Sequence, residues 1–399
     1  MAEEIEVPSH FLCPISMQLM KDPVTVSAGI TYDRESIERW LYSCKNNTCP
    51  VTRQPLSDTE LTPNHTLRRL IQAWCTINAS HGIQRIPTPN TYVHRTHISK
   101  LISDAKKSPF LHQKCLQTLR SIALKGSQSE NKCLEAAGAV EFLAPIINQN
   151  ESSTDEALSI LYHIEPSETS LKKLAKNDGQ IVVSLVRVLE CGNCQSRAYA
   201  IMLMKSTLKV ADPCQLTRIG PDLFTQVVQV VKDKISEQAS KAGLKLLAEV
   251  SPWGRNRVKV VQSGAVPVLV EMLLESSERR TCELALVVLD KLCGCAEGRA
   301  DLLQDGAGLA AVAKKILRVS HLATDRAVRI LGSICKYSAT SGVLQEMMQV
   351  GVVSKLCLVM EVDASVKVKE RSKEILKLHS KVWKNSPCLP SNLLSCYPS

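Results

Sequence analysis

Cysteine and histidine side chains near the start of the chain are candidate zinc ligands, but their spacing argues against a metal site. A module that holds two tetrahedral zinc ions needs eight such ligands, commonly arriving as Cys-x-x-Cys pairs. Cys13 is followed three residues later by Ser16, and Cys49 is followed three residues later by Thr52, so neither pair is completed. No metal or other cofactor is expected, because residues 1–80 offer only His10, Cys13, Cys44, Cys49, His65 and Cys75.

Polar side chains flank the regions where the metal sites of such a module would lie. A domain of about 75 residues has a marginal hydrophobic core, so it needs further stabilisation. We expect hydrogen bonds and charge pairs to supply it, and such networks hold only when each member is satisfied. The alternative for any one of these residues is an ordinary exposed position. The expected network consists of Asp22, Ser27, Asp33, Arg34 and Glu38.

Three short elements must position these side chains. The segment PVTVSAGITY, residues 23–32, predicts a β-hairpin with its turn near residues 27–29. Asp33 is a plausible N-cap for a helix that follows, and a second amphipathic helix is expected in PNHTLRRLIQAWC. The apolar faces are expected to comprise Ile37, Trp40 and Leu41 in the first helix and Leu67, Leu70, Ile71 and Trp74 in the second.

Composition favours packed helices. The chain has 399 residues, 44% of them apolar and only 4% aromatic, which suits stacked helices better than a β-sandwich. The acidic start lacks the layout of a secretory signal, and no apolar run reaches the roughly 20 residues that span a bilayer. We therefore expect a cytoplasmic protein, with the nucleus as the alternative and no membrane insertion.

A period of 41 to 45 residues marks the larger part of the chain. Glycine followed by a short apolar block recurs six times, and a second apolar helix is predicted after each block. This period is typical of solenoids with two or three helices per repeat. We expect a mostly α-helical, right-handed armadillo-repeat superhelix over residues 96–385, after a small α+β domain (5–80) and a linker (81–95), and before a flexible tail (386–399). The marker glycines, expected to adopt a left-handed backbone, are Gly138, Gly179, Gly220, Gly264, Gly306 and Gly351.

The excess of positive charge lies in the repeat-containing part of the chain, after residue 80. Residues 1–80 carry 7 Lys/Arg and 9 Asp/Glu, and the remainder carries 42 and 30, a net charge of +12. A basic groove favours an acidic segment of a partner protein and argues against a carrier of basic peptides. The charges are scattered rather than bunched, so nucleic acid is not expected. The candidate groove residues, on the second helix of each repeat, are Arg197, Lys241, Lys245, Arg279, Arg280, Arg326, Arg329 and Lys336.

Three stretches carry a family resemblance: FLCPISMQLMKDPVTVSAGITYDRESIERWL, TCPVTRQPL and LTPNHTLRRLIQAW. They resemble the U-box, a metal-free relative of the RING domain. With armadillo-like repeats after it, the chain resembles the plant U-box E3 ubiquitin ligases, and it is most similar to the compact subgroup associated with immune and stress signalling. The resemblance implies a scaffold that binds a ubiquitin-charged E2 enzyme and promotes transfer of ubiquitin to a lysine of a protein substrate.

The resemblance also implies which residues face the E2 enzyme. They are Ile15 and Met17 in a first loop, Trp40 on the helix, and Pro50 and Arg53 in a second loop. Arg53, with five N–H donors, would bridge carbonyls of E2 and ubiquitin and hold the thioester in a reactive arrangement. Ile15 and Trp40 are alternatively core residues.

One alternative function and one possible association stay open at this point. The alternative function is a non-catalytic armadillo adaptor, which has no need of an E2-binding surface. Association of two copies, or of this chain with another, through the U-box is also compatible with the resemblance.

Overall fold

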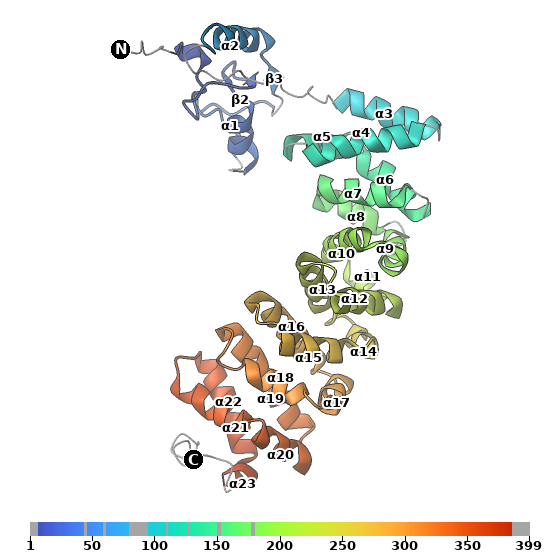
Figure 1. Ribbon diagram of the computed structural model, residues 1–399, viewed down its shortest axis with the longest axis vertical. Helices are drawn as coiled ribbons and strands as arrows, with labels where there is room; N and C mark the ends of the chain where they lie inside the picture. Colours follow the sequence, from blue (N-terminus) through green and yellow to red (C-terminus); the bar gives the residue numbers. More distant parts are fainter. Residues whose placement is uncertain are drawn as a thin grey trace. The chain divides into compact units, whose positions relative to one another are not determined.

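The computed structural model describes residues 7–43, 46–58, 61–79, 95–108, 111–125, 128–149, 153–176 and 180–384 (Figure 1). The chain divides into two compact units, Met1–Ile98 with Ser127–Cys133, and Ser99–Gly126 with Leu134–Ser399. The predicted tail, 386–399, and the predicted linker, 81–95, apart from residue 95, lie outside the described residues.

A small antiparallel sheet organises the N-terminal unit. β1 (Pro23–Thr25) lies between β2 (Thr31–Asp33) and β3 (Thr62–Pro63), and the hairpin register pairs Val24 with Tyr32. The hairpin turns at Gly29, whose φ of 78° is a left-handed backbone that favours glycine. The hairpin predicted over residues 23–32 is therefore confirmed.

Short helices flank this sheet. The 3₁₀ turn η1 (Ser9–Phe11) precedes it, α1 (Arg34–Glu38) continues into the π-helical turn η2 (Arg39–Ser43), and α2 (His65–Ile77) follows β3. Asn64 caps α2 by accepting a hydrogen bond from the Leu67 amide at 3.0 Å.

One of two expectations for these helices is wrong. Asp33 occupies the N-cap position of α1, as expected, although its side chain makes no capping hydrogen bond because its carboxylate accepts from two amides before β1. Leu70 was expected on the buried face of α2 and is instead 53% exposed.

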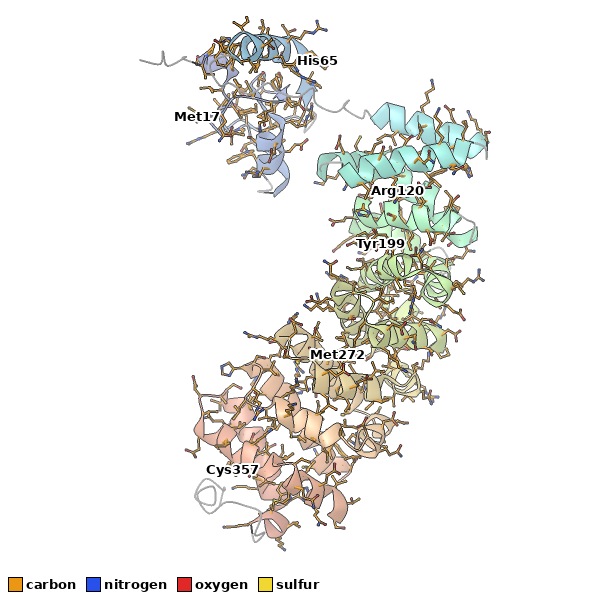
Figure 2. All side chains as sticks on the ribbon, viewed as in Figure 1. Met17, His65, Arg120, Tyr199, Met272 and Cys357 are labelled. Carbon is orange, nitrogen blue, oxygen red and sulfur yellow. The ribbon has the colours of Figure 1, made fainter. Side chains whose placement is uncertain are left out.

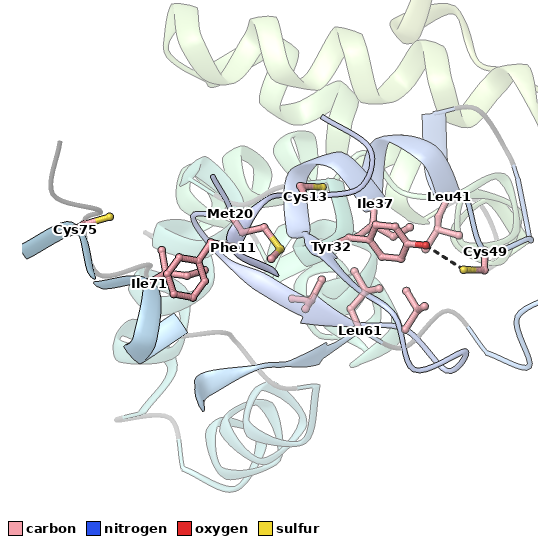
Figure 3. Close-up of a cluster of buried hydrophobic side chains, with 12 residues drawn as sticks. Phe11, Cys13, Met20, Tyr32, Ile37, Leu41, Cys49, Leu61, Ile71 and Cys75 are labelled. Atoms are coloured by element: carbon pink, nitrogen blue, oxygen red, sulfur yellow. Dashed lines mark hydrogen bonds between the residues drawn. The ribbon is translucent and has the colours of Figure 1, made fainter. Parts of the chain in front are cut away.

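A single hydrophobic cluster fills the N-terminal unit (Figure 3). Side chains from the loops, the sheet and both helices meet in it, and Ile15 and Trp40 pack against it from the side. Burial of this kind stabilises by about 25 cal/mol per Å² of apolar surface, so a small unit gains little from it alone. The cluster comprises Phe11, Cys13, Met20, Val24, Val26, Tyr32, Ile37, Leu41, Cys49, Leu61, Ile71 and Cys75.

Long helices stack in sequence order through the larger unit (Figure 1). Each contacts the next, so the apolar face that one repeat cannot bury alone is covered by its neighbour. This is the second helix predicted for each repeat, and the repeat architecture is confirmed. The series is α4 (His112–Lys125), α7 (Thr154–Ile164), α10 (Cys194–Lys209), α13 (Glu237–Val250), α16 (Arg279–Leu292), α19 (His321–Tyr337) and α22 (Val366–Leu378).

Two further series complete the repeats, after α3 (Arg95–Lys107) and before the short α23 (Ser380–Trp383). The helices after the marker glycines are α6 (Ala139–Gln149), α9 (Gln180–Cys191), α12 (Pro221–Asp233), α15 (Ala265–Glu275), α18 (Gly308–Lys315) and α21 (Val352–Glu361). The short first helices are α5 (Gln128–Ala136), α8 (Glu168–Lys176), α11 (Pro213–Thr217), α14 (Asn256–Gln262), α17 (Ala296–Gln304) and α20 (Ser341–Gln349).

The left-handed backbone expected at the marker glycines holds for only some of them. Gly264 and Gly351 have φ of 75° and 76° and directly precede α15 and α21. Gly220 has φ of −70°, because Pro221 already begins α12, and the expectation is wrong there. Of the other marker glycines, Gly138 is left-handed, Gly306 is not, and Gly179 lies outside the described residues.

Helix length bears on membrane insertion. Among the described residues no single helix is long and apolar enough to cross a membrane, and α20 with α21 passes only as a pair bent by 63°, by length and composition.

Ion pairs join neighbouring repeats along the long helices. Asp290 on α16 is only 8% exposed and accepts from Arg326 at 2.8 Å and Arg329 at 2.9 Å, both on α19. Arg371 on α22 reaches Asp325 on α19 at 3.0 Å. These basic residues therefore brace the stack, a role that net charge alone did not indicate.

Replacing Asp290 by Asn tests this brace. The change removes the carboxylate shared by the partly buried Arg326 and the exposed Arg329, so we expect the free energy of unfolding to fall by about 2 kcal/mol. Glu237→Gln is the matched control, because Glu237 pairs with Lys241 at an exposed position and such pairs contribute about 0.2–1 kcal/mol. Urea unfolding of the full chain, followed by circular dichroism, gives both values, and equal losses in the two variants would contradict the brace.

Candidate functional site

Two loops of the N-terminal unit have the same conformation. The segments CPISMQ and CPVTRQ begin at Cys13 and Cys49. In each, the cysteine amide donates to the glutamine carbonyl five residues on, at 2.8 and 2.9 Å, and the amide of the fifth residue donates back to the cysteine carbonyl at 2.8 Å. That fifth residue is Met17 or Arg53, with φ of 54° and 59°. A left-handed backbone is costly for such residues, so the surrounding structure must hold it in place.

The first loop is held by the thiol of Cys13, which is fully buried. Its sulfur accepts a hydrogen bond from the Asp33 amide at 3.2 Å. Burial raises the pKa of the Cys13 thiol, but hydrogen bonds from Ser16 and the Asp33 amide outweigh burial and hold that pKa below its usual value. The hydroxyl of Ser16 thus stands where a paired zinc ligand would be expected.

The second loop is held in the same way through Cys49. Its thiol lies 3.0 Å from the Tyr32 hydroxyl, which also accepts a hydrogen bond from the Val51 amide at 3.3 Å (Figure 3). Burial raises the pKa of the Cys49 thiol, and hydrogen bonds from Thr52 and Tyr32 lower it by more. Burial beside this thiol raises the pKa of Tyr32 well above its usual value, so the phenol keeps its proton.

Adjacent residues at the end of β2 therefore clamp the two loops. Tyr32 binds the second loop and the Asp33 amide binds the first. The Asp33 carboxylate also accepts from the amides of Lys21 and Asp22 at 2.8 and 2.9 Å. Within the described residues no three His, Cys, Asp or Glu side chains are grouped to hold a metal ion.

Four of the five predicted polar residues gather beside β2. Arg34 donates to Asp22 at 2.6 Å and lies 3.9 Å from Glu38. Arg68, which sequence reasoning missed, approaches Asp22 at 4.0 Å from α2. Asp33 belongs to this group through its amide contacts.

Ser27 lies outside the network. It is exposed at the hairpin turn, and no hydrogen bond of its side chain appears within the described residues, so the bracing role expected of it is wrong. The hairpin needs only a compact residue at this position, since Gly29 supplies the left-handed backbone.

Four of the five residues expected to face a partner lie in the clamped loops, and the fifth, Trp40, lies on η2. Met17 is 70% exposed (Figure 2). Arg53 is also exposed and has no ion pair to any described residue. Ile15 and Pro50 are partly buried in their loops. Trp40 is also partly buried, and its indole N–H donates to the Thr48 carbonyl at 2.8 Å, which ties η2 to the second loop. Trp40 is therefore partly a core residue, as the alternative had it.

Most of the eight predicted groove residues already have carboxylate partners. Arg197 binds Asp233 at 2.6 Å, and Lys241 lies 3.5 Å from Glu278. Arg279 and Arg280 share Glu283, and Arg326 and Arg329 share Asp290. Of the eight, only Lys245 and Lys336 have no carboxylate partner among the described residues. A continuous basic groove along all the repeats is therefore not what these residues form.

Comparison with known proteins identifies both units. The U-box domain model matches residues 7–80, and the model of the plant U-box protein ARM repeat region matches residues 97–399. The chain belongs to the plant U-box proteins with armadillo repeats. Residues 7–80 are accordingly its U-box, and residues 97–399 form its armadillo-repeat region.

Relatives share the whole architecture. E3 ubiquitin-protein ligase PUB23 of Arabidopsis thaliana is 54% identical, with 100% of this chain and 98% of that protein covered. E3 ubiquitin-protein ligase PUB22 of the same plant is 48% identical, with both chains covered completely. A solved structure from a study of cadherin and beta-catenin shares the solenoid fold, with a TM-score of 0.60 at 13% identity over 81% of this chain and 58% of that one.

These findings establish the activity class. The chain is a U-box E3 ubiquitin-protein ligase, which interacts with an E2 enzyme and ubiquitin through the U-box and with substrate through the armadillo repeats. Sequence reasoning missed Tyr32 and the shared conformation of the loops. The signal was present, because CPISMQ and CPVTRQ match at cysteine, proline, an apolar β-branched residue, a hydroxyl residue and glutamine.

Replacing Tyr32 by Phe tests the clamp on the second loop. The change removes the acceptor of the Val51 amide and leaves the buried Cys49 thiol without that partner, so we expect a loss of about 1–3 kcal/mol in U-box stability. Hydrogen–deuterium exchange on the full chain measures this loss in the second loop, where we expect faster amide exchange in residues 49–54. Tyr337→Phe in the solenoid is the matched control, and unchanged exchange in Tyr32→Phe would contradict the clamp.

Proposed function

We propose that the E2 enzyme docks on the surface formed by the two clamped loops and Trp40. The observation that carries this proposal is the paired left-handed residue in each loop, which presents Met17 and Arg53 to solvent on fixed backbone. An exposed apolar side chain beside rigid proline-containing loops is the usual composition of a small interface anchor. Ile15 and Pro50 supply its partly buried floor.

Arg53 is the residue that promotes transfer. Its guanidinium has no ion pair to satisfy among the described residues, so its N–H donors are available to carbonyls of E2 and ubiquitin together. Holding both partners at once favours the closed arrangement in which the thioester meets the attacking lysine. The U-box needs no nucleophile of its own in this scheme, which separates a ligase from the adaptor alternative.

Arg53→Ala is expected to slow autoubiquitination without unfolding the protein. Charge-assisted hydrogen bonds are worth about 1.5–3 kcal/mol, so the rate should fall by about 10- to 100-fold. Ubiquitin ladders are measured with a panel of E2 enzymes. Ile15→Ala should also lose these ladders, and circular dichroism checks that this variant folds. Arg69→Ala on α2 is the matched control, since Arg69 is equally exposed but lies outside the loops. Full ladders from Arg53→Ala and Ile15→Ala would refute the docking surface.

We also propose that two copies associate through α2 of the U-box. Leu70 and Ile77 are 53% and 77% exposed, and they lie seven residues apart, on one face of the helix with the exposed Ala73 between them. Exposed apolar side chains in a contiguous row are typical of interaction sites.

Changing Leu70 and Ile77 together to Glu tests this association. The double variant places charge on the apolar face, so a dimer should become a monomer when the molar mass is measured by light scattering after size exclusion. Leu124→Glu, an equally exposed leucine on α4, should leave the mass unchanged. A monomeric native chain, or a dimer that survives the double change, would contradict the proposal.

Capture of substrate through an acidic segment is our proposal for the solenoid, supported by its net positive charge. A cytoplasmic location, with the nucleus as the alternative, and a role in plant immune or stress signalling stay predictions. Imaging of a tagged full chain in plant cells checks the location.

A further inference from the structure

A hollow lies across the last three long helices of the solenoid. It has a volume of about 620 Å³ and is formed by the C-terminal halves of α16, α19 and α22. Gly332 on α19 keeps its floor low, since the nearest atom to a side chain there would be Ile375 Cδ1 at 3.4 Å. The wall residues that matter here are Arg329, Lys336, Tyr337, Arg371 and Leu378.

Positive charge concentrates on these three helices. Their sequences give α16, α19 and α22 net charges of +1, +2 and +3, which is half of the +12 carried by residues 81–399. Asp290 is shared by two arginines, so that group keeps a net positive charge, and Lys336 has no carboxylate partner among the described residues. Burial lowers the pKa of the Lys291 ammonium, and the nearby Arg326 guanidinium lowers it further, as expected in a locally positive field.

Apolar surface lies beside this charge. Tyr337 is 61% exposed and Leu378 is 56% exposed. Two cations lie near the Tyr337 ring, with the Arg299 guanidinium 5.1 Å and the Lys336 ammonium 5.2 Å from its centroid. Arg299 is itself fixed by hydrogen bonds of 3.0 Å to the Ser338 hydroxyl and the Cys293 carbonyl. The hollow thus offers an aromatic ring and an exposed leucine next to the Lys336 ammonium, which has no carboxylate partner among the described residues.

The earlier repeats offer a different surface. A second hollow, on α4, α7 and α10, contains the carboxylates of Asp155 and Glu156 against the single cation of Arg120. The Asp155 carboxylate accepts hydrogen bonds from the Ser196 hydroxyl at 2.6 Å and the Asn193 side-chain amide at 2.8 Å. Its charge is unfavourable for an acidic ligand, so charge complementarity favours the C-terminal hollow over this one.

We propose that the hollow on α16, α19 and α22 is the docking site for an acidic segment of a protein substrate that carries a bulky apolar side chain. This inference rests on the proposed capture of substrate by the solenoid and assigns it a place. Lys336 receives a carboxylate, Arg329 favours a further acidic residue because it shares Asp290 with Arg326, and the apolar side chain packs between Tyr337 and Leu378. Asp290, Asp325 and Glu374 stand among these cations, and they disfavour the continuous phosphates of a nucleic acid.

Fluorescence anisotropy on the full chain tests the proposal. The probe is a fluorescein-labelled peptide, Glu-Glu-Asp-Phe-Glu-Asp-Leu-Glu-Glu, and its comparison replaces every acidic residue by the matching amide. We expect the acidic probe alone to bind, and its affinity to fall as salt rises. Lys336→Glu should weaken binding by about tenfold, because it replaces an attraction with a repulsion. Tyr337→Ala should also weaken it through loss of the apolar contact.

Lys245→Glu is the matched control, because it makes the same charge change on α13, away from the hollow. Equal affinities of Lys336→Glu and Lys245→Glu, equal binding of the amide peptide, or no binding of the acidic probe would overturn the proposal. Full displacement of the probe by single-stranded DNA at equimolar concentration would overturn it in favour of a nucleic-acid site.

Autoubiquitination separates this inference from the proposed E2 surface. Lys336→Glu should build ladders as the native chain does, since the hollow lies far along the sequence from the U-box loops. If the native chain builds ubiquitin ladders but does not bind the acidic peptide, only the proposed docking site is refuted. Ladders lost in Arg53→Ala, with probe binding intact, would support both assignments independently.

Discussion

Two hydrogen bonds from adjacent residues at the end of β2 determine what the U-box can do. The Tyr32 hydroxyl meets the Cys49 thiol, and the Asp33 amide meets the Cys13 thiol, so one point of the sheet fixes both loops. Because the fifth residue of each loop has a left-handed backbone that is costly in isolation, neither loop would keep its shape without this support. The thiols remain as hydrogen-bonding partners, and Ser16 and Thr52 stand where further metal ligands would be needed.

The solenoid achieves rigidity by a different means. Its repeats share apolar faces, and ion pairs such as that between Arg371 and Asp325 join one long helix to the next. Carboxylates that neutralise most of the basic side chains leave excess positive charge at a few places only. Recognition of a partner by charge is therefore confined to those places. The two units have different roles: the U-box presents fixed loops to the E2 enzyme, and the repeats bind the substrate.

The sequence predicted those elements whose residue pattern is local, namely the hairpin and the long helices. The hairpin followed from Gly29 between β-forming residues, and the long helices followed from apolar positions three and four apart. The short first helices, such as α11 with five residues, are too brief to show a period. The partner of Arg329 could not be predicted, because Asp290 lies 39 residues earlier, about one repeat away, and only stacking brings them together. The same holds for Tyr32 and Cys49, which the fold joins across 17 residues.

The central claim is that hydrogen bonds at Tyr32 and Asp33, rather than a bound ion, hold the loops that meet the E2 enzyme. The most direct test is elemental analysis of the purified full chain together with its thermal unfolding in excess EDTA. The account predicts substoichiometric zinc and an unchanged unfolding midpoint of the U-box. One or two equivalents of zinc per chain, with unfolding of the loops on chelation, would contradict it.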